Sequence, residues 1–265
     1  MDFLYDKVLG CLAGSNIGSA MGAAVEGWEP ERIEKEYGIL KELLPYAHYG
    51  NYGKPGSGRM RPPGTTEDGI ERQRLMCTAI IEKGGRITAA DLAKVWARDI
   101  NPDWFGVQME PCDEILYKAA MSGIPPKEVG RYTNFTGINS FGRSCHPIGL
   151  INACNPSQAV LDCYEVGQLY QPLHGYGLDY AAAVCAAIAE AMKPNATVQS
   201  VVDVAMDVLP EGDPNQKPRR ELQWALDLAD KSKDVWDLRN RFYERYTGRG
   251  TPYAMSWAQE VIIKG

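Results

Sequence analysis

Apolar residues recur at intervals of three and four along most of the chain, which is the spacing of one buried face of an α-helix. The clearest stripes are Val198, Val201, Val202, Ala205 and Leu209, then Leu222, Ala225, Leu226 and Ala229, and then Val235, Leu238, Phe242 and Tyr246. No segment alternates persuasively between apolar and polar residues, and no repeat has a fixed period. The pattern predicts an all-α fold, a compact helical bundle, with residues 1–265 as a single domain.

Local signals place several helix ends. The run Thr88-Ala89-Ala90-Asp91 resembles a capping box with Asp in place of Glu, and it predicts a helix that begins after Thr88. Ser157 predicts the start of a further helix, because serine often caps a helix N-terminus. Asp179 opens an alanine-rich run that Pro194 ends, since proline cannot continue a helix.

Two stretches lack helical signals. Residues 45–66 and 132–149 are rich in Gly, Pro, Asn and Ser, so we expect long loops there. Loops of this length in a helical domain usually carry function. Nothing between them is typical of an interdomain linker, which favours one domain.

Composition narrows the function classes. The net charge of −6 disfavours a protein that binds duplex nucleic acid through its phosphates. Seven cysteines without a Cys-x-x-Cys pair are typical of reduced thiols in a cytoplasmic protein, and the three histidines lack zinc-ligand spacing. Residues 8–25 carry no charged side chain, but an acidic flank precedes them and glycines interrupt them. We therefore expect a cytoplasmic protein without a signal peptide or membrane span.

Four glycines recur at every fourth position of the first predicted helix, at Gly10, Gly14, Gly18 and Gly22. Each costs up to about 1 kcal/mol relative to alanine, so the stripe needs a compensating gain. One interpretation is close packing against another helix, and the other is close approach of the backbone to a ligand or metal. Glu26 follows four residues after Gly22 and shares its face if the helix continues that far.

Thr66-Glu67-Asp68 stands between a Gly/Pro-rich loop and an apolar helix. One interpretation is a helix start, with Thr66 as the N-cap and the two acids complementing the helix dipole. The other is a cation site, because a hydroxyl and two carboxylates offer the hard oxygen ligands that Mg²⁺ prefers. The spacing alone leaves both open.

Residues 137–149 form a Gly/Ser/Asn-rich segment that contains Arg143 and His146. Such a loop can hold a phosphate through backbone N–H groups and the fork of an arginine. An ordinary polar loop has the same composition, and a histidine before a proline is more often structural than catalytic.

Taken in order, these segments resemble the ADP-ribosylglycohydrolase family, also called the dinitrogenase-reductase-activating glycohydrolase-like family. The family's opening helix, G-x-x-x-G-D-A-x-G-x-x-x-E, resembles residues 14–26, and its Thr-Asp-Asp metal motif resembles Thr66-Glu67-Asp68. Its phosphate loop, which ends in Pro-x-Gly-Leu, is similar to the segment ending Pro147-Ile148-Gly149-Leu150. An alanine-rich helix introduced by Asp179 and the closing segment 256–261 also resemble the family.

The resemblance implies an orthogonal helical bundle around two Mg²⁺ ions that cleaves an ADP-ribosyl bond. It implies that Thr66, Glu67 and Asp68 are metal ligands, and that Glu26, beside the substrate ribose, and Asp68 are catalytic. The implied substrate-binding residues are Asn139, Ser140, Gly142, Arg143, Ser144 and His146. In this chemistry, metal ions orient the ribose hydroxyls, and a carboxylate or metal-bound water supplies the nucleophile.

The chain departs from the family pattern in several places. Ser19 stands where the family commonly has Asp, Glu67 replaces an Asp, and Arg143 comes one position early. The second metal motif, Gly-x-Asp-x-Asp-Thr, has no counterpart. We therefore expect a magnesium site that is incomplete in this chain. Three explanations stay open: the chain is a fragment that lacks its last helices, a partner supplies the missing ligands, or the metal site has been lost.

These observations favour a Mg²⁺-dependent hydrolase that cleaves an ADP-ribosyl, or related ribosyl, N- or O-glycosidic bond. Two alternatives stay open: an inactive protein that binds ADP-ribose or a nucleotide, and a helical scaffold protein. The expected partner is a small-molecule or ADP-ribosylated substrate. The sequence is also compatible with a homo-oligomer.

Overall fold

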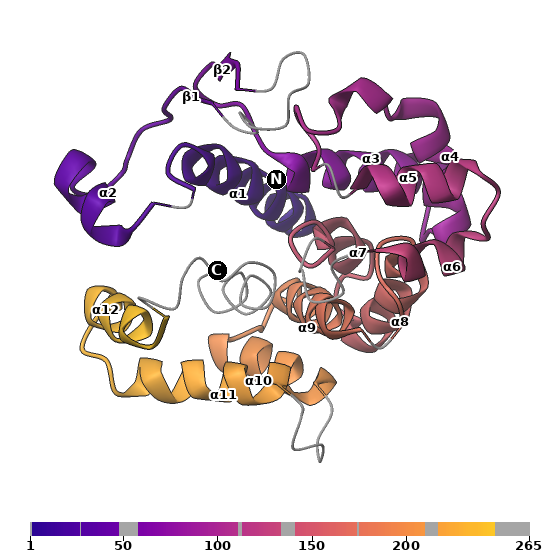
Figure 1. Cartoon of the computed structure of the whole chain (residues 1–265). Helices are drawn as coiled ribbons and strands as arrows, with labels where there is room; N and C mark the ends of the chain where they lie inside the picture. The colour runs from indigo at the N-terminus through magenta and orange to yellow at the C-terminus, as the bar shows by residue number, and fades with distance from the viewer. Residues whose placement is uncertain are drawn as a thin grey trace.

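Helices make up nearly all the regular structure in the described part of the chain, which confirms the all-α prediction (Figure 1). The computed structural model describes residues 2–26, 28–47, 58–110, 113–133, 141–173, 175–209 and 217–246. Their α-helices are α1 (Phe3–Ala23), α2 (Pro30–Tyr37), α3 (Asp68–Lys83), α4 (Ala89–Asp99), α5 (Asp113–Met121), α6 (Pro126–Val129), α7 (His146–Ile151), α8 (Pro156–Gly167), α9 (Tyr176–Ala191), α10 (Val198–Val208), α11 (Lys217–Asp230) and α12 (Val235–Tyr246). Two short 3₁₀ helices are η1 (Pro102–Trp104) and η2 (Gly130–Tyr132).

Helix α9 lies between the neighbouring helices α7, α8 and α10 and packs against all three (Figure 1). Its sequence explains this position, because Ala181, Ala182, Ala186 and Ala189 are all buried. Small side chains leave room for neighbouring helices to approach from several sides. The alanine-rich run therefore forms the central helix of the bundle.

Helices α7 and α9 meet at Gly149. A Cβ at this position would lie 2.7 Å from the Cβ of Ile188 and 3.0 Å from the carbonyl oxygen of Cys185. Both neighbouring atoms belong to stiff parts of α9, so they cannot move aside easily. Only glycine permits this close approach of the two backbones.

Replacing Gly149 with alanine is expected to lower the free energy of unfolding by about 2 kcal/mol, because the added methyl group overpacks the contact. The matched substitution Gly14→Ala in α1 should raise it by up to about 1 kcal/mol, since alanine is the better helix former. No described atom lies within 4 Å of a Cβ at Gly14. Urea unfolding followed by circular dichroism measures both changes. Equal effects of the two substitutions would contradict the close contact at Gly149.

A second part of the core joins α3 and α4 to α8. Leu75 and Met76 of α3 and Leu92 of α4 are fully buried. The Tyr170 ring lies 5.0 Å from the Trp96 ring and 5.0 Å from the Phe141 ring, measured between centroids. This aromatic group ties α4 to the ends of the loops that precede α7 and follow α8.

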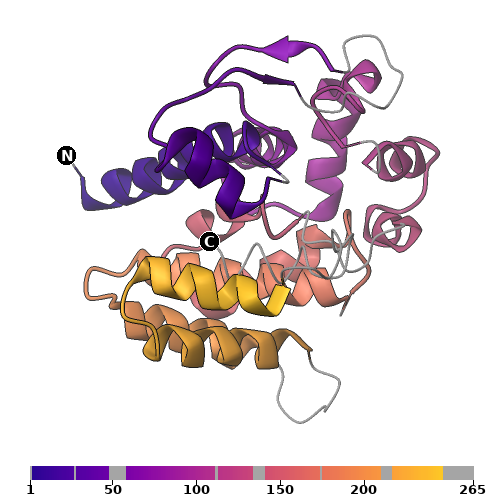
Figure 2. The same ribbon diagram turned by 60° about the vertical axis from the view of Figure 1, so that its left-hand side comes forward.

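Helices α11 and α12 lie side by side on the lower face of the bundle (Figure 2). The Trp224 ring of α11 lies 5.6 Å from the Phe242 ring of α12, measured between centroids. Phe242 belongs to the apolar stripe that the sequence shows in α12, whereas Trp224 is not among the positions of the α11 stripe. These two helices and α10 form where the periodicity predicts them.

The predicted helix ends are right in one case and displaced in two. Thr88 caps α4, and both bonds of the capping box with Asp91 are present. The prediction at Ser157 is wrong, because the N-cap of α8 is Asn155, whose side chain accepts from the backbone of Gln158. Asp179 does not open α9, which begins at Tyr176, one turn earlier.

The two expected loops hold some regular structure. Strand β1 (Tyr46–Ala47) pairs antiparallel with β2 (Met60–Arg61) at the edges of the first loop. The second loop ends early, because α7 begins at His146. Pro147 lies in the first turn of α7, where a missing N–H costs nothing. None of the described helices is both long and apolar enough to cross a membrane.

Candidate functional site

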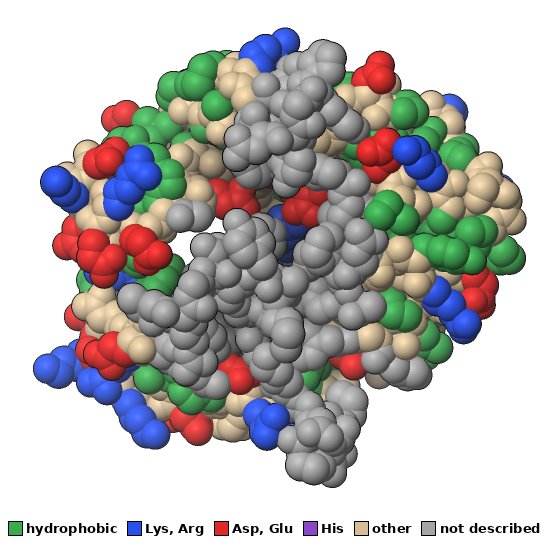
Figure 3. Space-filling model, viewed as in Figure 1, with side chains coloured by type: hydrophobic (Ala, Val, Ile, Leu, Met, Phe, Trp, Pro, Cys, Tyr) green, Lys and Arg blue, Asp and Glu red, His purple; other side chains and the backbone are tan. Residues whose placement is uncertain are grey.

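A cavity of about 1020 Å³ opens between α1, the start of α3, the segment leading into α7, and helices α9–α11. Its volume matches the upper end of the range for small-molecule sites, roughly 300–1,000 Å³. Acidic and basic side chains lie together at the floor of a hollow on one face (Figure 3). Helix α9 contributes Tyr180, Ala183, Val184, Ala187 and Ile188 to the wall.

Glu26 and Asp68 line this one cavity, although they come from different elements. Helix α1 ends at Ala23, so Glu26 lies in the turn that follows and not on the helix itself. Its side chain is exposed, whereas Asp68 is only 2% exposed. Both acidic residues therefore line one cavity, one of them accessible and the other buried.

The other predicted site residues divide into three groups. Glu67, Gly142, Arg143 and His146 line the cavity. Thr66 and Ser144 are not part of its wall, and the buried Ser144 hydroxyl donates to the carbonyl of Phe141 at 3.2 Å. Asn139 and Ser140 lie outside the described residues.

Helix α3 begins one residue later than the cap interpretation predicts. Its N-cap is Glu67 and not Thr66, and Glu67 makes no side-chain capping bond. The carboxylate instead accepts from Arg61 at 3.1 Å and from the hydroxyl of Tyr46. The Glu67 backbone N–H donates to the Ser19 hydroxyl at 3.1 Å, which fastens the helix start to α1.

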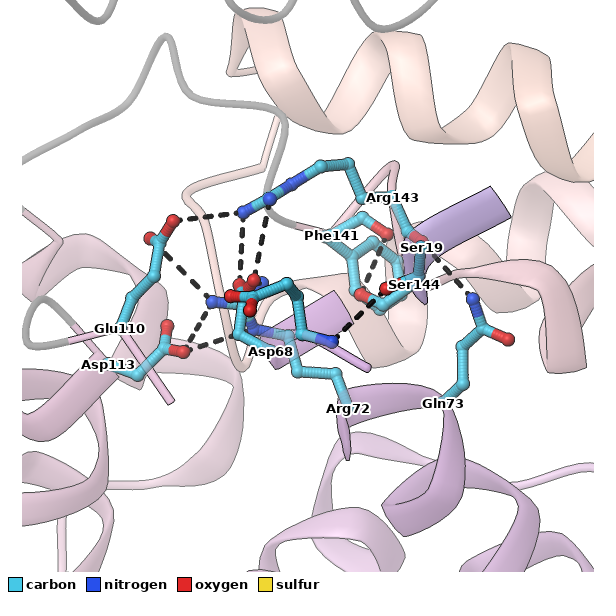
Figure 4. Close-up of polar contacts among 10 residues, drawn as sticks. Ser19, Asp68, Arg72, Gln73, Glu110, Asp113, Phe141, Arg143 and Ser144 are labelled. Atoms are coloured by element: carbon cyan, nitrogen blue, oxygen red, sulfur yellow. Dashed lines mark hydrogen bonds and ion pairs between the residues drawn. The ribbon is translucent and has the colours of Figure 1, made fainter. Parts of the chain in front are cut away.

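A buried network of charges surrounds Asp68 (Figure 4). Arg72, one turn later on α3 and fully buried, pairs with Asp68 and with Asp113 of α5. Arg143 donates to Asp68 at 3.0 Å and to Glu110 at 3.1 Å. Two guanidinium groups thus lie among three carboxylates.

The environment of this network changes the pKa values of Asp113 and Arg72. Burial raises the pKa of Asp113 to about 6, and the nearby Arg72 opposes that rise. The carboxylates of Asp113, Asp68 and Glu110 raise the pKa of Arg72 above its ordinary value although burial lowers it, so Arg72 stays charged. Asp68 is therefore a fixed partner of two permanent cations.

The sequence profile of the ADP-ribosylglycohydrolase family matches residues 1–262, nearly the whole chain. The chain belongs to the ADP-ribosylglycohydrolase family. A search of curated proteins found no match. The family consists of glycohydrolases that act on ADP-ribose-type substrates. The cavity and the acidic residues at its wall come from the segments whose motifs resemble this family.

The described carboxylates of this family member do not fit a magnesium pair as they are arranged. Mg²⁺ needs several oxygen ligands that face one point. In the described part of the chain, no three Asp, Glu, His or Cys side chains gather in this way. Asp68 and Glu67 face guanidinium groups, whose charge would repel a divalent ion. Magnesium binding stays a prediction, and no step proposed below depends on it.

The glycine stripe on α1 lies on an open face among the described residues. A Cβ at Gly10, Gly14, Gly18 or Gly22 would meet no described atom within 4 Å. Close helix packing therefore does not explain the stripe within the described residues. Gly18 and Gly22 instead line the cavity, as the second interpretation expects.

The sequence motifs do not point to Arg72, Gln73, Glu110 or Asp113. Arg72 had a signal, because positions 72, 75, 76 and 79 form the buried stripe of α3 and only the first is charged. A charge on such a stripe must find partners inside the protein. The identity of those partners, Glu110 and Asp113, depends on how α5 packs against α3 and has no local sequence signal.

Proposed function

We propose that the chain hydrolyses the N- or O-glycosidic bond that joins an ADP-ribosyl group to its acceptor, with the ADP-ribosyl group held in the cavity described above. The observation that carries this proposal is that Glu26 and Asp68 line the same cavity. Family membership supports the reaction class. The cavity volume of about 1020 Å³ suits a ligand as large as ADP-ribose.

In this proposal Glu26 acts as the general base. Its exposed carboxylate accepts a proton from water, the water oxygen bonds to the anomeric carbon, and the bond from that carbon to the acceptor breaks. The acceptor leaves with a proton taken up from solvent, and Glu26 returns its proton to solvent. The products are ADP-ribose and the free acceptor. Asp68 does not transfer the proton, because two arginines hold it as a charged partner.

Asp68 has an organising role in this scheme. Its carboxylate fixes the guanidinium of Arg143, which lines the cavity, and Glu110 fixes the same group from a second direction. A restrained arginine loses little freedom when a charged ligand arrives. The substrate would therefore meet a wall that is already in place.

A second candidate is a protein that binds ADP-ribose without cleaving its bonds. The pairing of Asp68 and Glu67 with arginines favours it, because these pairs neutralise the carboxylates that a metal-dependent reaction would use. Under this alternative the cavity still accepts the ligand, and Glu26 contributes only to binding.

One experiment separates the candidates. The purified chain is incubated with peptides that carry N-linked or O-linked ADP-ribose, with Mg²⁺ or with a chelator, and released ADP-ribose is measured by chromatography. Calorimetry with ADP-ribose measures binding in parallel. We expect release of ADP-ribose, which would support hydrolysis. If the chelator abolishes that release, the reaction requires a metal ion. Binding without release would support the second candidate. If the chain neither releases nor binds ADP-ribose, both candidates are contradicted and a scaffold is favoured.

A further inference from the structure

Gln73 of α3 lies behind the cavity wall and is 3% exposed. Its side-chain nitrogen is 2.8 Å from the Ser15 hydroxyl, 3.1 Å from Nδ1 of His146 and 3.3 Å from the backbone carbonyl oxygen of Arg143. Figure 4 shows the contact with the carbonyl. One buried amide therefore touches a residue on each of two cavity-lining segments.

The carbonyl of Arg143 fixes which way this amide points. A carbonyl oxygen only accepts hydrogen bonds, so the amide nitrogen must face it. If the amide were reversed, the Gln73 side-chain oxygen would lie 3.3 Å from the carbonyl oxygen of Arg143. The amide nitrogen would then occupy the present Oε1 position, which has no described partner, so both N–H groups would lack a described acceptor. The hydrogen-bond network thus assigns the amide orientation.

This orientation determines the protonation of His146. The amide has two N–H groups for three neighbouring acceptors, so one N–H is shared between two of them. In this arrangement Nδ1 of His146 accepts and carries no proton. Burial lowers the pKa of His146, so the ring is neutral near pH 7. A neutral imidazole has one proton, which must then be on Nε2. His146 lines the cavity, and its Nε2 has no partner among the described residues.

Two serines of α1 line the same cavity, one turn apart. The Ser15 hydroxyl accepts from Gln73 at 2.8 Å, and the Ser19 hydroxyl accepts from the backbone of Glu67 at 3.1 Å. Each hydroxyl keeps its own proton, which has no acceptor in the described part of the chain. Ser19 occupies the position at which the family commonly has an aspartate, a residue that could only accept.

We propose that Gln73 is a positioning residue that holds His146 as the Nε2–H tautomer, and that His146, Ser15 and Ser19 donate hydrogen bonds to oxygen atoms of the ADP-ribosyl group. The identity of the ligand rests on the proposed function, whereas the tautomer depends only on this chain. Neutral donors suit this wall, because the cavity already contains three carboxylates, those of Glu26, Glu67 and Asp68.

Nitrogen-15 NMR of the full chain tests the proposal. The chain has three histidines, so His146→Asn assigns the signal by its loss. We expect the free protein at neutral pH to show the Nε2–H form of His146, and ADP-ribose to shift its Nε2 resonance. In Gln73→Met, which keeps the side-chain volume, we expect a mixture of tautomers and about threefold to tenfold weaker ADP-ribose binding, the effect of one lost hydrogen bond.

Gln168→Met is the matched control, because the Gln168 amide donates only to the Tyr164 carbonyl at 2.9 Å, away from the cavity. It should leave both the tautomer and the binding unchanged. An Nδ1–H form in the unsubstituted chain would overturn the proposal and requires no variant. An unchanged tautomer in folded Gln73→Met would also overturn it, as would ADP-ribose binding that leaves the Nε2 resonance in place. Failure of ADP-ribose to bind would overturn the ligand part and the proposed function, while the tautomer measurement would still decide the role of Gln73.

Discussion

Turnover by the Glu26→Gln variant is expected to fall by about 10²–10⁴-fold, while ADP-ribose affinity stays within a few fold of the unsubstituted chain. The amide has nearly the same shape as the carboxylate, but it cannot take a proton from water. Glu26 lies in an exposed turn after α1, so the substitution should leave the fold intact. Initial rates of ADP-ribose release and calorimetric affinities measure the two effects separately.

Glu29→Gln is the control for this prediction. Glu29 is an exposed acid three residues further along, and it does not line the cavity. As the N-cap of α2 it makes no side-chain capping bond, so its replacement should change neither turnover nor stability. If Glu26→Gln retains the full rate, Glu26 is not the general base.

Removal of the buried guanidinium in Arg72→Met should lower the free energy of unfolding by about 3–5 kcal/mol. The substitution leaves Asp68 and Asp113 buried without their closest cation. A buried carboxylate without a cation is costly, because it must either keep its charge without water or a partner, or take up a proton above its ordinary pKa. Chemical unfolding followed by circular dichroism measures the loss.

The loss of unfolding free energy in Arg72→Met should depend on pH. A carboxyl group whose pKa is raised by folding stabilises the fold below its ordinary pKa, and that contribution is lost as the pH rises through the folded value. For Asp113 the folded value is about 6. Arg72 holds it down, so the loss of Arg72 raises it further, and the defect should be larger near pH 7.5 than near pH 5.

Arg98→Met provides the comparison, because Arg98 also pairs with two acids, Glu82 and Asp99, but is 54% exposed. Water screens such pairs, so this variant should unfold almost like the unsubstituted chain at either pH. If the two arginine variants were equally stable, the buried network would contribute nothing to the fold.

Most helices could be predicted from the sequence, because their apolar stripes are long and regular. Helices α10 to α12 follow their stripes, and the capping box at Thr88 starts α4 as expected. Short elements were missed for a physical reason. The strand pair β1–β2 and the six-residue helix α7 are too short to show a period, and neighbouring segments stabilise them.

The candidate site was predictable only in part. The family resemblance implied a common site for Glu26, Asp68 and Arg143, and all three line one cavity although they are far apart in the sequence. The pairing of Asp68 with Arg72 and Arg143 could not be predicted, because it depends on packing between α3, α5 and the segment before α7. The Mg²⁺ ligands and the substrate contacts remain predictions, and Asn139 and Ser140 lie outside the described residues.

The alanines of α9 have a consequence for how the site can diversify. Ala183 and Ala187 form their part of the cavity wall with single methyl groups, on a helix whose backbone is held by α7, α8 and α10. At these two positions the depth of the cavity therefore depends on how far the side chain extends, and not on where the backbone runs. A descendant of this chain could adapt to a smaller ligand by replacing those two alanines with residues that have longer side chains, without a change in the backbone.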